Sequence, residues 1–138
     1  MAERARRWLD RFAGWPAVAG WAVVIFGLSS IPNNFAPSES AIPADKIAHA
    51  IEFAVLAVLV AWTLARSRSA GVTLTLAFAA AFISSAYGVT DEIHQRYVPG
   101  RDVTVGDFFA DVGGAALGAC VALTLGNGRV TRRQRPNL

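Results

Sequence analysis

Residues 47–65 read IAHAIEFAVLAVLVAWTLA, and this stretch decides the fold class of the chain. His49 and Glu52 are its only titratable residues, both lie near its beginning, and Arg66 follows its last residue. A helix rises about 1.5 Å per residue, so a helix of this length covers a hydrocarbon core of roughly 30 Å. The stretch therefore predicts a helix that crosses a membrane.

Three further apolar runs of comparable length flank this stretch, at residues 15–31, 72–89 and 108–125. The composition agrees, because 54% of the residues are hydrophobic and 17% are charged, whereas soluble domains carry about 25% charged residues. The sequence therefore predicts an all-α fold, a four-helix transmembrane bundle at residues 15–125. A basic segment (1–14) precedes the bundle, and a basic tail (126–138) follows it.

Basic residues are distributed unevenly between the two sides of such a bundle. Of the 13 lysines and arginines, all but Lys46, Arg96 and Arg101 lie on the side of the two termini. The positive-inside rule then predicts that both termini are cytoplasmic, an N-in/C-in arrangement. The basic residues cluster at the ends of apolar runs without interleaved aromatic residues, so the expected partner is the lipid bilayer and no nucleic acid.

Small residues recur at four-residue spacing in two of the runs. They are Ala77, Ala81 and Ser85 in the third run and Ala110, Gly114, Gly118 and Ala122 in the fourth. Small residues on one stripe let helix backbones approach closely in lipid. The spacing predicts that the third and fourth helices pack together, and a lipid-facing groove is the alternative.

Acidic residues gather on the outer side of the predicted bundle. Apart from Glu3 and Asp10, every acidic residue lies there, together with both histidines. Their spacing of three or four residues places them on shared helix faces, in the sets Asp45-Lys46-His49-Glu52, Asp91-His94 and Asp107-Asp111. Ionisable groups inside a span are costly, so we expect these residues to face one another across the bundle. A polar plug, with Lys46 or Arg101 pairing the carboxylates, is the purely structural alternative.

A dense polar string, DEIHQRYVPGR at residues 91–101, follows the third run. The string resembles the VanZ-like family of small bacterial membrane proteins, and the resemblance extends over about residues 29–123 through Asp45, Lys46, His49, Glu52, Asp107, Gly114 and Gly118. One position departs from the family pattern, because the family usually has asparagine where this chain has Asp111.

The resemblance implies a multi-pass protein of the bacterial inner (cytoplasmic) membrane. The namesake of the family is an accessory factor for resistance to teicoplanin, a glycopeptide antibiotic with a lipid tail. The resemblance therefore implies a resistance or envelope accessory factor whose partner is a lipid-linked envelope substrate or a lipoglycopeptide. It brings no established reaction with it.

The chemistry of the motif residues suggests roles for them. A histidine beside a carboxylate can transfer protons near neutral pH, so the candidate catalytic residues are His49, Glu52, Asp91, Glu92, His94 and Asp107. Cationic and polar side chains can hold an anionic head group, so the candidate substrate-binding residues are Lys46, Gln95, Arg101 and Asp111. Pro99-Gly100 predicts a turn that lets Arg101 fold back over the others.

A divalent metal ion is a possible cofactor. Nitrogen and oxygen ligands suit Zn²⁺ or Mn²⁺, and the candidate ligands are His49, Glu52, Asp91 and His94, with Asp107 as a further one.

Two alternative functions, in which the protein catalyses no reaction, stay open beside the hypothesis that it is an enzyme. The protein can bind a lipid or lipoglycopeptide without changing it, or it can be a small proton-coupled transporter, for which a buried Glu52 and Asp111 would be suited.

Overall fold

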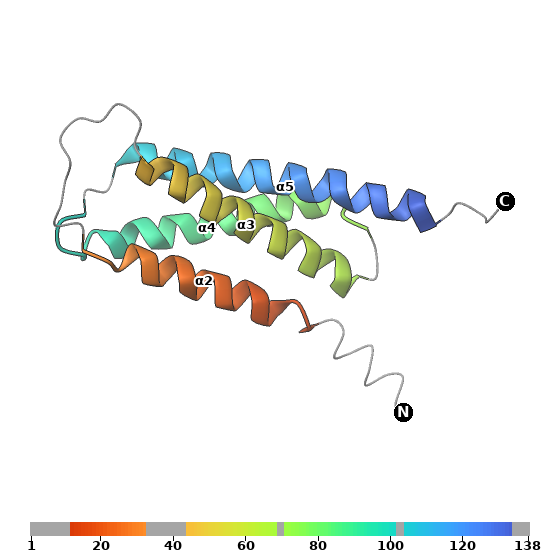
Figure 1. Cartoon of the computed structure of the whole chain (residues 1–138), viewed down its shortest axis with the longest axis horizontal. Coiled ribbons are helices and arrows are strands. Elements are labelled where there is room, and N and C mark those ends of the chain that lie inside the picture. The colour runs from red at the N-terminus through yellow and green to blue at the C-terminus, as the bar shows by residue number, and fades with distance from the viewer. Residues whose placement is uncertain (1–11, 33–43, 69–70, 102–103, 134–138) are drawn as a thin grey trace.

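The computed structural model describes residues 12–32, 44–68, 71–101 and 104–133. These residues form four helices and no strand, which confirms the predicted all-α fold (Figure 1). The helices are α2 (Trp15–Ser29), α3 (Ala44–Ser67), α4 (Leu74–Gln95) and α5 (Val105–Arg133). Successive helices run in alternating directions, so the beginning of α2 and the end of α5 point toward the same end of the bundle (Figure 1).

Three of the helices are long and apolar enough to cross a membrane. The candidate spans are Asp45–Ser67 in α3, Leu74–Gln95 in α4 and Val105–Gly126 in α5. The fourth helix, α2, has 15 residues, and at about 1.5 Å per residue it is shorter than a hydrocarbon core of roughly 30 Å. It begins where the sequence predicts, with Pro16 in its first turn, but it ends two residues early, at Ser29.

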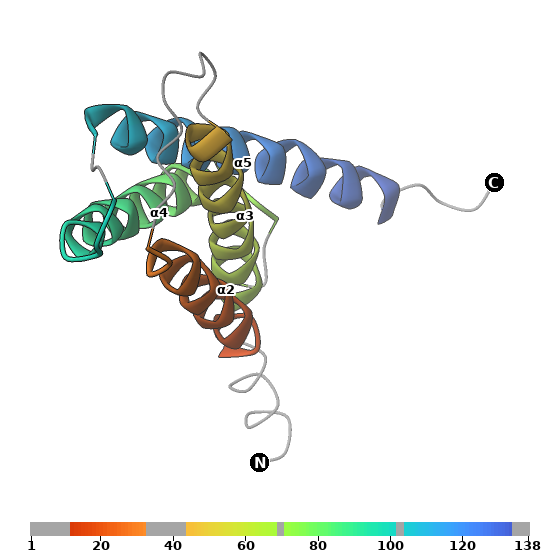
Figure 2. The same cartoon turned by 60° about the vertical axis from the view of Figure 1, so that its left-hand side comes forward.

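The helix α3 lies at the centre of the bundle and contacts each of the other three helices, most extensively α5 (Figure 2). The core is built from small and aliphatic side chains around Phe53, Leu56 and Val60 of α3. The outward faces are also apolar, and Phe78, Phe82 and Leu117 are among the large side chains exposed there. Lipid can cover such faces, whereas water would leave an unusually large apolar surface exposed.

The two glycines of the small-residue stripe in α5 pack against the backbone of α3. A methyl group added at Gly114 would collide with the backbone of Ala50, and one added at Gly118 would collide with that of Ala54. The helices α4 and α5 do touch, as predicted, but the closest approach of the glycines is to α3. The stripe brings these two backbones together because glycine has no side chain to hold them apart.

We expect Gly114→Ala and Gly118→Ala to destabilise the bundle, whereas Gly113→Ala should be neutral or slightly stabilising. The first two additions overpack the α3–α5 contact, which costs about 1–3 kcal/mol. A methyl group on Gly113 meets nothing within 4 Å, and alanine favours a helix over glycine by about 1 kcal/mol. Thermal unfolding of the purified variants in detergent measures the difference. Equal melting temperatures for all three would contradict the packing.

Candidate functional site

Buried polar side chains gather at one end of the bundle, where α2 and α4 end and α3 and α5 begin. We call this the polar end, and its buried members are Ser29, His49, Asp91, Glu92, Gln95, Asp107 and Asp111. The core between the helices toward the opposite end is apolar apart from Thr63 and Ser84, among the residues described. The predicted sets on three helices are therefore brought to one region by the fold.

Local sequence features extend α4 and α5 far enough to carry these residues. The helix α4 continues through the polar string to Gln95, and Gly100, with φ at 75°, lets the chain turn back behind it. The helix α5 begins at Val105, three residues before the apolar run. Thr104 precedes it and donates its backbone N–H (3.0 Å) and hydroxyl (2.7 Å) to the carboxylate of Asp107, an arrangement that satisfies the helix N-terminus.

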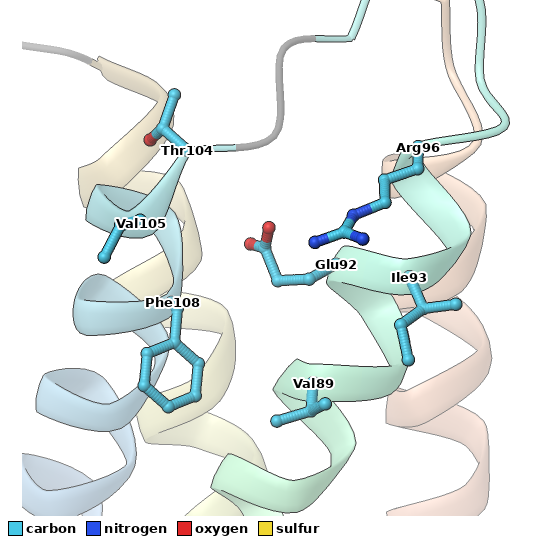
Figure 3. A pocket seen from close by; sticks show the side chains of 7 residues that line it. All are labelled: Val89, Glu92, Ile93, Arg96, Thr104, Val105 and Phe108. Atoms are coloured by element: carbon cyan, nitrogen blue, oxygen red, sulfur yellow. The ribbon is translucent and has the colours of Figure 1, made fainter.

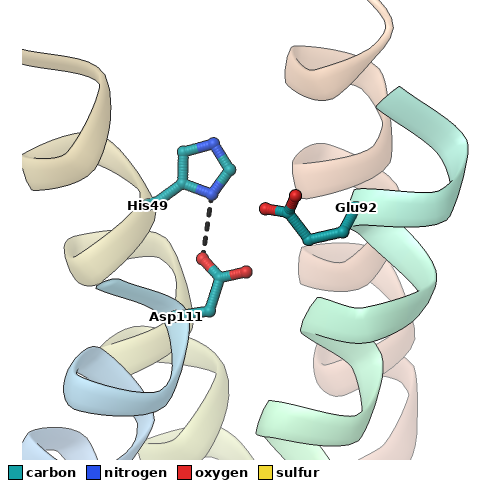
Figure 4. A group of neighbouring side chains, drawn as sticks. All are labelled: His49, Glu92 and Asp111. Atoms are coloured by element: carbon teal, nitrogen blue, oxygen red, sulfur yellow. Dashed lines mark hydrogen bonds and ion pairs between the residues drawn. The ribbon is translucent and has the colours of Figure 1, made fainter. Parts of the chain in front are cut away.

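His49, Glu92 and Asp111 form the most deeply placed group, which we call the His–Glu–Asp cluster (Figure 4). Nδ1 of His49 lies 2.8 Å from Oδ1 of Asp111, and these residues are 3% and 0% exposed. The carboxylate of Glu92, which is 7% exposed, points toward both of them (Figure 4). One possible ligand atom from each residue lies within 4.8 Å of the other two.

Three of the four carboxylate oxygens in the His–Glu–Asp cluster lack a hydrogen-bond donor. Both oxygens of Glu92 and Oδ2 of Asp111 are buried, and no described residue donates to them. Gly88 of α4 lies beside Oδ2 of Asp111, since a methyl group added at Gly88 would come within 2.8 Å of this oxygen. Buried acceptors are normally satisfied, so these oxygens mark a site for something that compensates negative charge.

A second network ties α2 to the cluster. Oδ2 of Asp91 accepts hydrogen bonds from the Ser29 hydroxyl (2.7 Å) and from Nε2 of Gln95 (2.8 Å). The same amide nitrogen donates to the Ser29 hydroxyl at 3.2 Å and lies 3.5 Å from Nε2 of His49. The network fixes Gln95 next to the imidazole, and it holds the end of α2 against α4.

Lys46 and Arg101, which we expected to hold a substrate, are engaged with the protein. Lys46 forms an ion pair with Asp107 at 2.7 Å, while Arg101 donates to the carbonyls of Leu28 (3.0 Å) and Ile31 (3.3 Å). Arg101 also lies 3.4 Å from the carboxylate of Asp45. The arginine therefore satisfies carbonyls at the C-terminus of α2, where a cation is favourable.

The remaining candidates lie beside the His–Glu–Asp cluster without belonging to it. His94 stacks on Phe26, with ring centroids 4.2 Å apart, and its Nε2 lies 2.9 Å from the hydroxyl of Ser30. Glu52 is half-buried, and its backbone carbonyl accepts a hydrogen bond of 2.9 Å from the indole of Trp21. Of the five residues suggested as metal ligands, only His49 belongs to the group that the described residues bring within ligand distance.

Three contributors to the polar end are not among the site residues predicted from the sequence, namely Ser29, Gly88 and Arg96. Ser29 could have been noticed as a polar residue that ends an otherwise apolar run. Gly88 carried no signal of its own, because its importance comes from the side chain packed against it. Arg96 was counted for the charge balance, but its position one turn after Glu92 also places it on the same helix face.

A groove between α4 and α5 has one member of the His–Glu–Asp cluster, Glu92, in its lining (Figure 3). It has a volume of about 370 Å³ and is lined by Val89, Glu92, Ile93, Arg96, Thr104, Val105 and Phe108. The side chains of Glu92 and Arg96 both point into it, near the turn, while Val89 and Phe108 line its deeper part (Figure 3). Glu92 therefore faces both the groove and the buried pair His49–Asp111.

A model of the VanZ/LLP1 family matches residues 10–126 of the chain. The matched range contains α2, α3, α4 and the membrane-spanning part of α5, and therefore every residue of the polar end. Neither the curated proteins nor the solved structures yielded a match. Asp111, which contacts His49, lies within the matched range.

We expect Arg101→Lys to lower the thermal stability of the protein in the absence of any substrate. Lysine keeps the positive charge but loses the planar fork that reaches Leu28, Ile31 and Asp45 together. Hydrogen bonds from charged groups contribute about 1.5–3 kcal/mol when buried, and partial exposure should reduce the loss to about 1 kcal/mol.

The matched control is Arg96→Lys, because no described residue accepts a hydrogen bond from the side chain of Arg96. Thermal unfolding in detergent, without added lipid, compares the two variants. If Arg101→Lys unfolds at the wild-type temperature, Arg101 does not stabilise the end of α2 and is free to bind a substrate.

Proposed function

The chain belongs to the VanZ/LLP1 family, and we propose that it binds a lipid-linked envelope molecule with an anionic head group in the α4–α5 groove and acts on that head group. The observation that carries the proposal is the position of Glu92. This residue lines the groove and also faces the buried pair His49–Asp111. A head group in the groove would therefore meet Glu92 and Arg96, and through Glu92 it would lie next to the buried pair.

The lining of the groove suits an amphipathic molecule. Val89, Ile93, Val105 and Phe108 supply apolar contacts, whereas Glu92, Arg96 and Thr104 lie toward the turn (Figure 3). A lipid aligned with the bundle would place its chain along the apolar part and its head group at the polar end. Binding sites commonly combine an apolar lining with a few polar groups that fix orientation.

Arg96 is the best-placed residue to hold an anionic head group. Its side chain is exposed and points into the groove (Figure 3). The other cations of the polar end, Lys46 and Arg101, already pair with Asp107 and with the end of α2. A guanidinium can bind a phosphate or carboxylate with two parallel hydrogen bonds.

The size of the groove favours a small head group over a whole glycopeptide. Its volume of about 370 Å³ is at the lower end of the roughly 300–1,000 Å³ of ligand pockets. A lipoglycopeptide would therefore place only its tail there. A role as an envelope or antibiotic-resistance accessory factor is compatible with either molecule, and the proposed location is the outer face of the bacterial inner membrane.

The reactive groups support chemistry on the head group. His49 contacts Asp111 at 2.8 Å, so the carboxylate can orient the imidazole as a general base or acid. Glu92 would be the group nearest to the substrate. A transporter is less well supported, because the described core between the helices toward the opposite end is apolar apart from Thr63 and Ser84.

We expect Arg96→Gln to weaken the binding of anionic lipids about tenfold or more, because it removes a charged hydrogen bond worth about 1.5–3 kcal/mol. Purified protein is incubated with a bacterial lipid extract, and bound lipids are identified by native mass spectrometry. Arg66→Gln is the matched control, since it removes the same exposed charge from the last turn of α3, at the opposite end. Equal binding by wild type and Arg96→Gln would place the lipid elsewhere.

The same incubation separates catalysis from binding. If the protein is an enzyme, the wild type converts a lipid species, and His49→Ala binds this species but does not convert it. The lipid can instead stay bound to the wild type without being converted, and be lost from Arg96→Gln. This outcome would show that the protein binds the lipid without acting on it, and it would exclude the proposed proton transfer.

A further inference from the structure

The His–Glu–Asp cluster joins one side chain from each of the three membrane-spanning helices. His49 comes from α3, Glu92 from α4 and Asp111 from α5 (Figure 4). All three are buried, and one possible ligand atom from each lies within 4.8 Å of the other two. Such a group has the residue types and the spacing of a metal-binding site.

Among the described residues, none outside the cluster donates a charged hydrogen bond to it. Both oxygens of Glu92 and Oδ2 of Asp111 are buried without a hydrogen bond from a described residue. Lys46 pairs with Asp107 and Arg101 with the end of α2, and Arg96, which lines the groove beside Glu92, forms no hydrogen bond with its carboxylate. Two carboxylates in an apolar interior are costly unless a cation or a proton compensates their charge.

We propose that His49, Glu92 and Asp111 bind a single divalent metal ion, with Zn²⁺ as the preferred ion. One imidazole and two carboxylates are a borderline set of nitrogen and oxygen ligands, which suits Zn²⁺ better than Mg²⁺ or Ca²⁺. Ligand atoms about 2.0–2.2 Å from a tetrahedral Zn²⁺ lie about 3.4 Å from one another. The ligand atoms now lie within 4.8 Å of one another. Glu92 would move closer, which it can because no hydrogen bond fixes its carboxylate, and His49 and Asp111, now 2.8 Å apart, would separate slightly.

The packing around the cluster would hold one of the ligands in place before the metal binds. Gly88 lets Asp111 lie directly against α4. Surroundings that orient a metal ligand raise the affinity of a site. Binding would replace the proton shared by His49 and Asp111, because a metal ligand must be deprotonated, and His49 would then act as a ligand in place of a general base.

Three protein ligands leave one position of a tetrahedral ion open, as in catalytic zinc sites. Glu92 lines the α4–α5 groove, so this position would face the groove and could accept water or a head-group oxygen. This last point rests on the proposed function. Metal binding itself does not, since it needs only the three ligands.

The test measures Zn²⁺ binding to the full chain in detergent, without added lipid. Wild-type protein is stripped with a chelator and titrated with Zn²⁺ by calorimetry, and we expect one ion per chain. Glu92→Gln should weaken binding about 100-fold or more, because loss of a supporting residue alone costs about 10–100-fold. The control Glu52→Gln, which neutralises an intramembrane carboxylate outside the cluster, should bind Zn²⁺ as the wild type does.

The thermal stability of the stripped proteins shows whether the variants fold. Glu92→Gln removes an unpaired charge and no hydrogen bond, so it should unfold at or above the wild-type temperature, and Zn²⁺ should stabilise the wild type but not this variant. Asp111→Asn changes a second proposed ligand, and we expect it to weaken Zn²⁺ binding as much as Glu92→Gln does. Absence of Zn²⁺ binding to the wild type, or equal binding by Glu92→Gln, would overturn the proposal, whatever the lipid-binding result.

Discussion

The close contact of α3 and α5 through Gly114 and Gly118 is the constraint on which the polar end depends. Each glycine lies against the backbone of α3, at Ala50 and Ala54. His49 precedes Ala50 in the chain, and Asp111 lies three residues before Gly114 on α5. A backbone approach that only glycine permits therefore also brings the imidazole within 2.8 Å of the carboxylate, so packing and site geometry are set by the same contact.

The helix α4 completes the site by a similar device. Gly88 lies beside the free oxygen of Asp111, and Glu92 lies four residues further on the same helix, and therefore on the same face. Asp111 thus lies at the junction of three helices, next to His49 of α3 and to Gly88 and Glu92 of α4. Substitutions at the glycines would therefore disturb the site as well as the packing, since small displacements matter for ligand geometry.

The ionisable residues of the polar end fall into two groups with different consequences. Asp91, Asp107 and Arg101 are hydrogen-bonded to neighbouring helices or helix ends, and they hold the ends of the helices together. Both oxygens of Glu92 have no such partner among the described residues, and neither do one oxygen of Asp111 and the second oxygen of Asp91. The residues with hydrogen-bond partners stabilise the ends of the helices, and the packed helices keep the residues without partners in an apolar interior. We infer function from the second group, because uncompensated charge there is costly.

The helices, and the end of the bundle at which the polar residues lie, follow from local sequence. Hydropathy and helical period are local properties, so the apolar runs and the spacing of His49 and Glu52 could be read directly. Which candidates contact one another depends on the packing of the helices. Contacts between helices depend on their rotation about their own axes, which local spacing leaves free. In the folded protein Glu92 lies with His49 and Asp111 in the cluster, and Glu52 lies outside it. Arg101 donates hydrogen bonds to the end of α2.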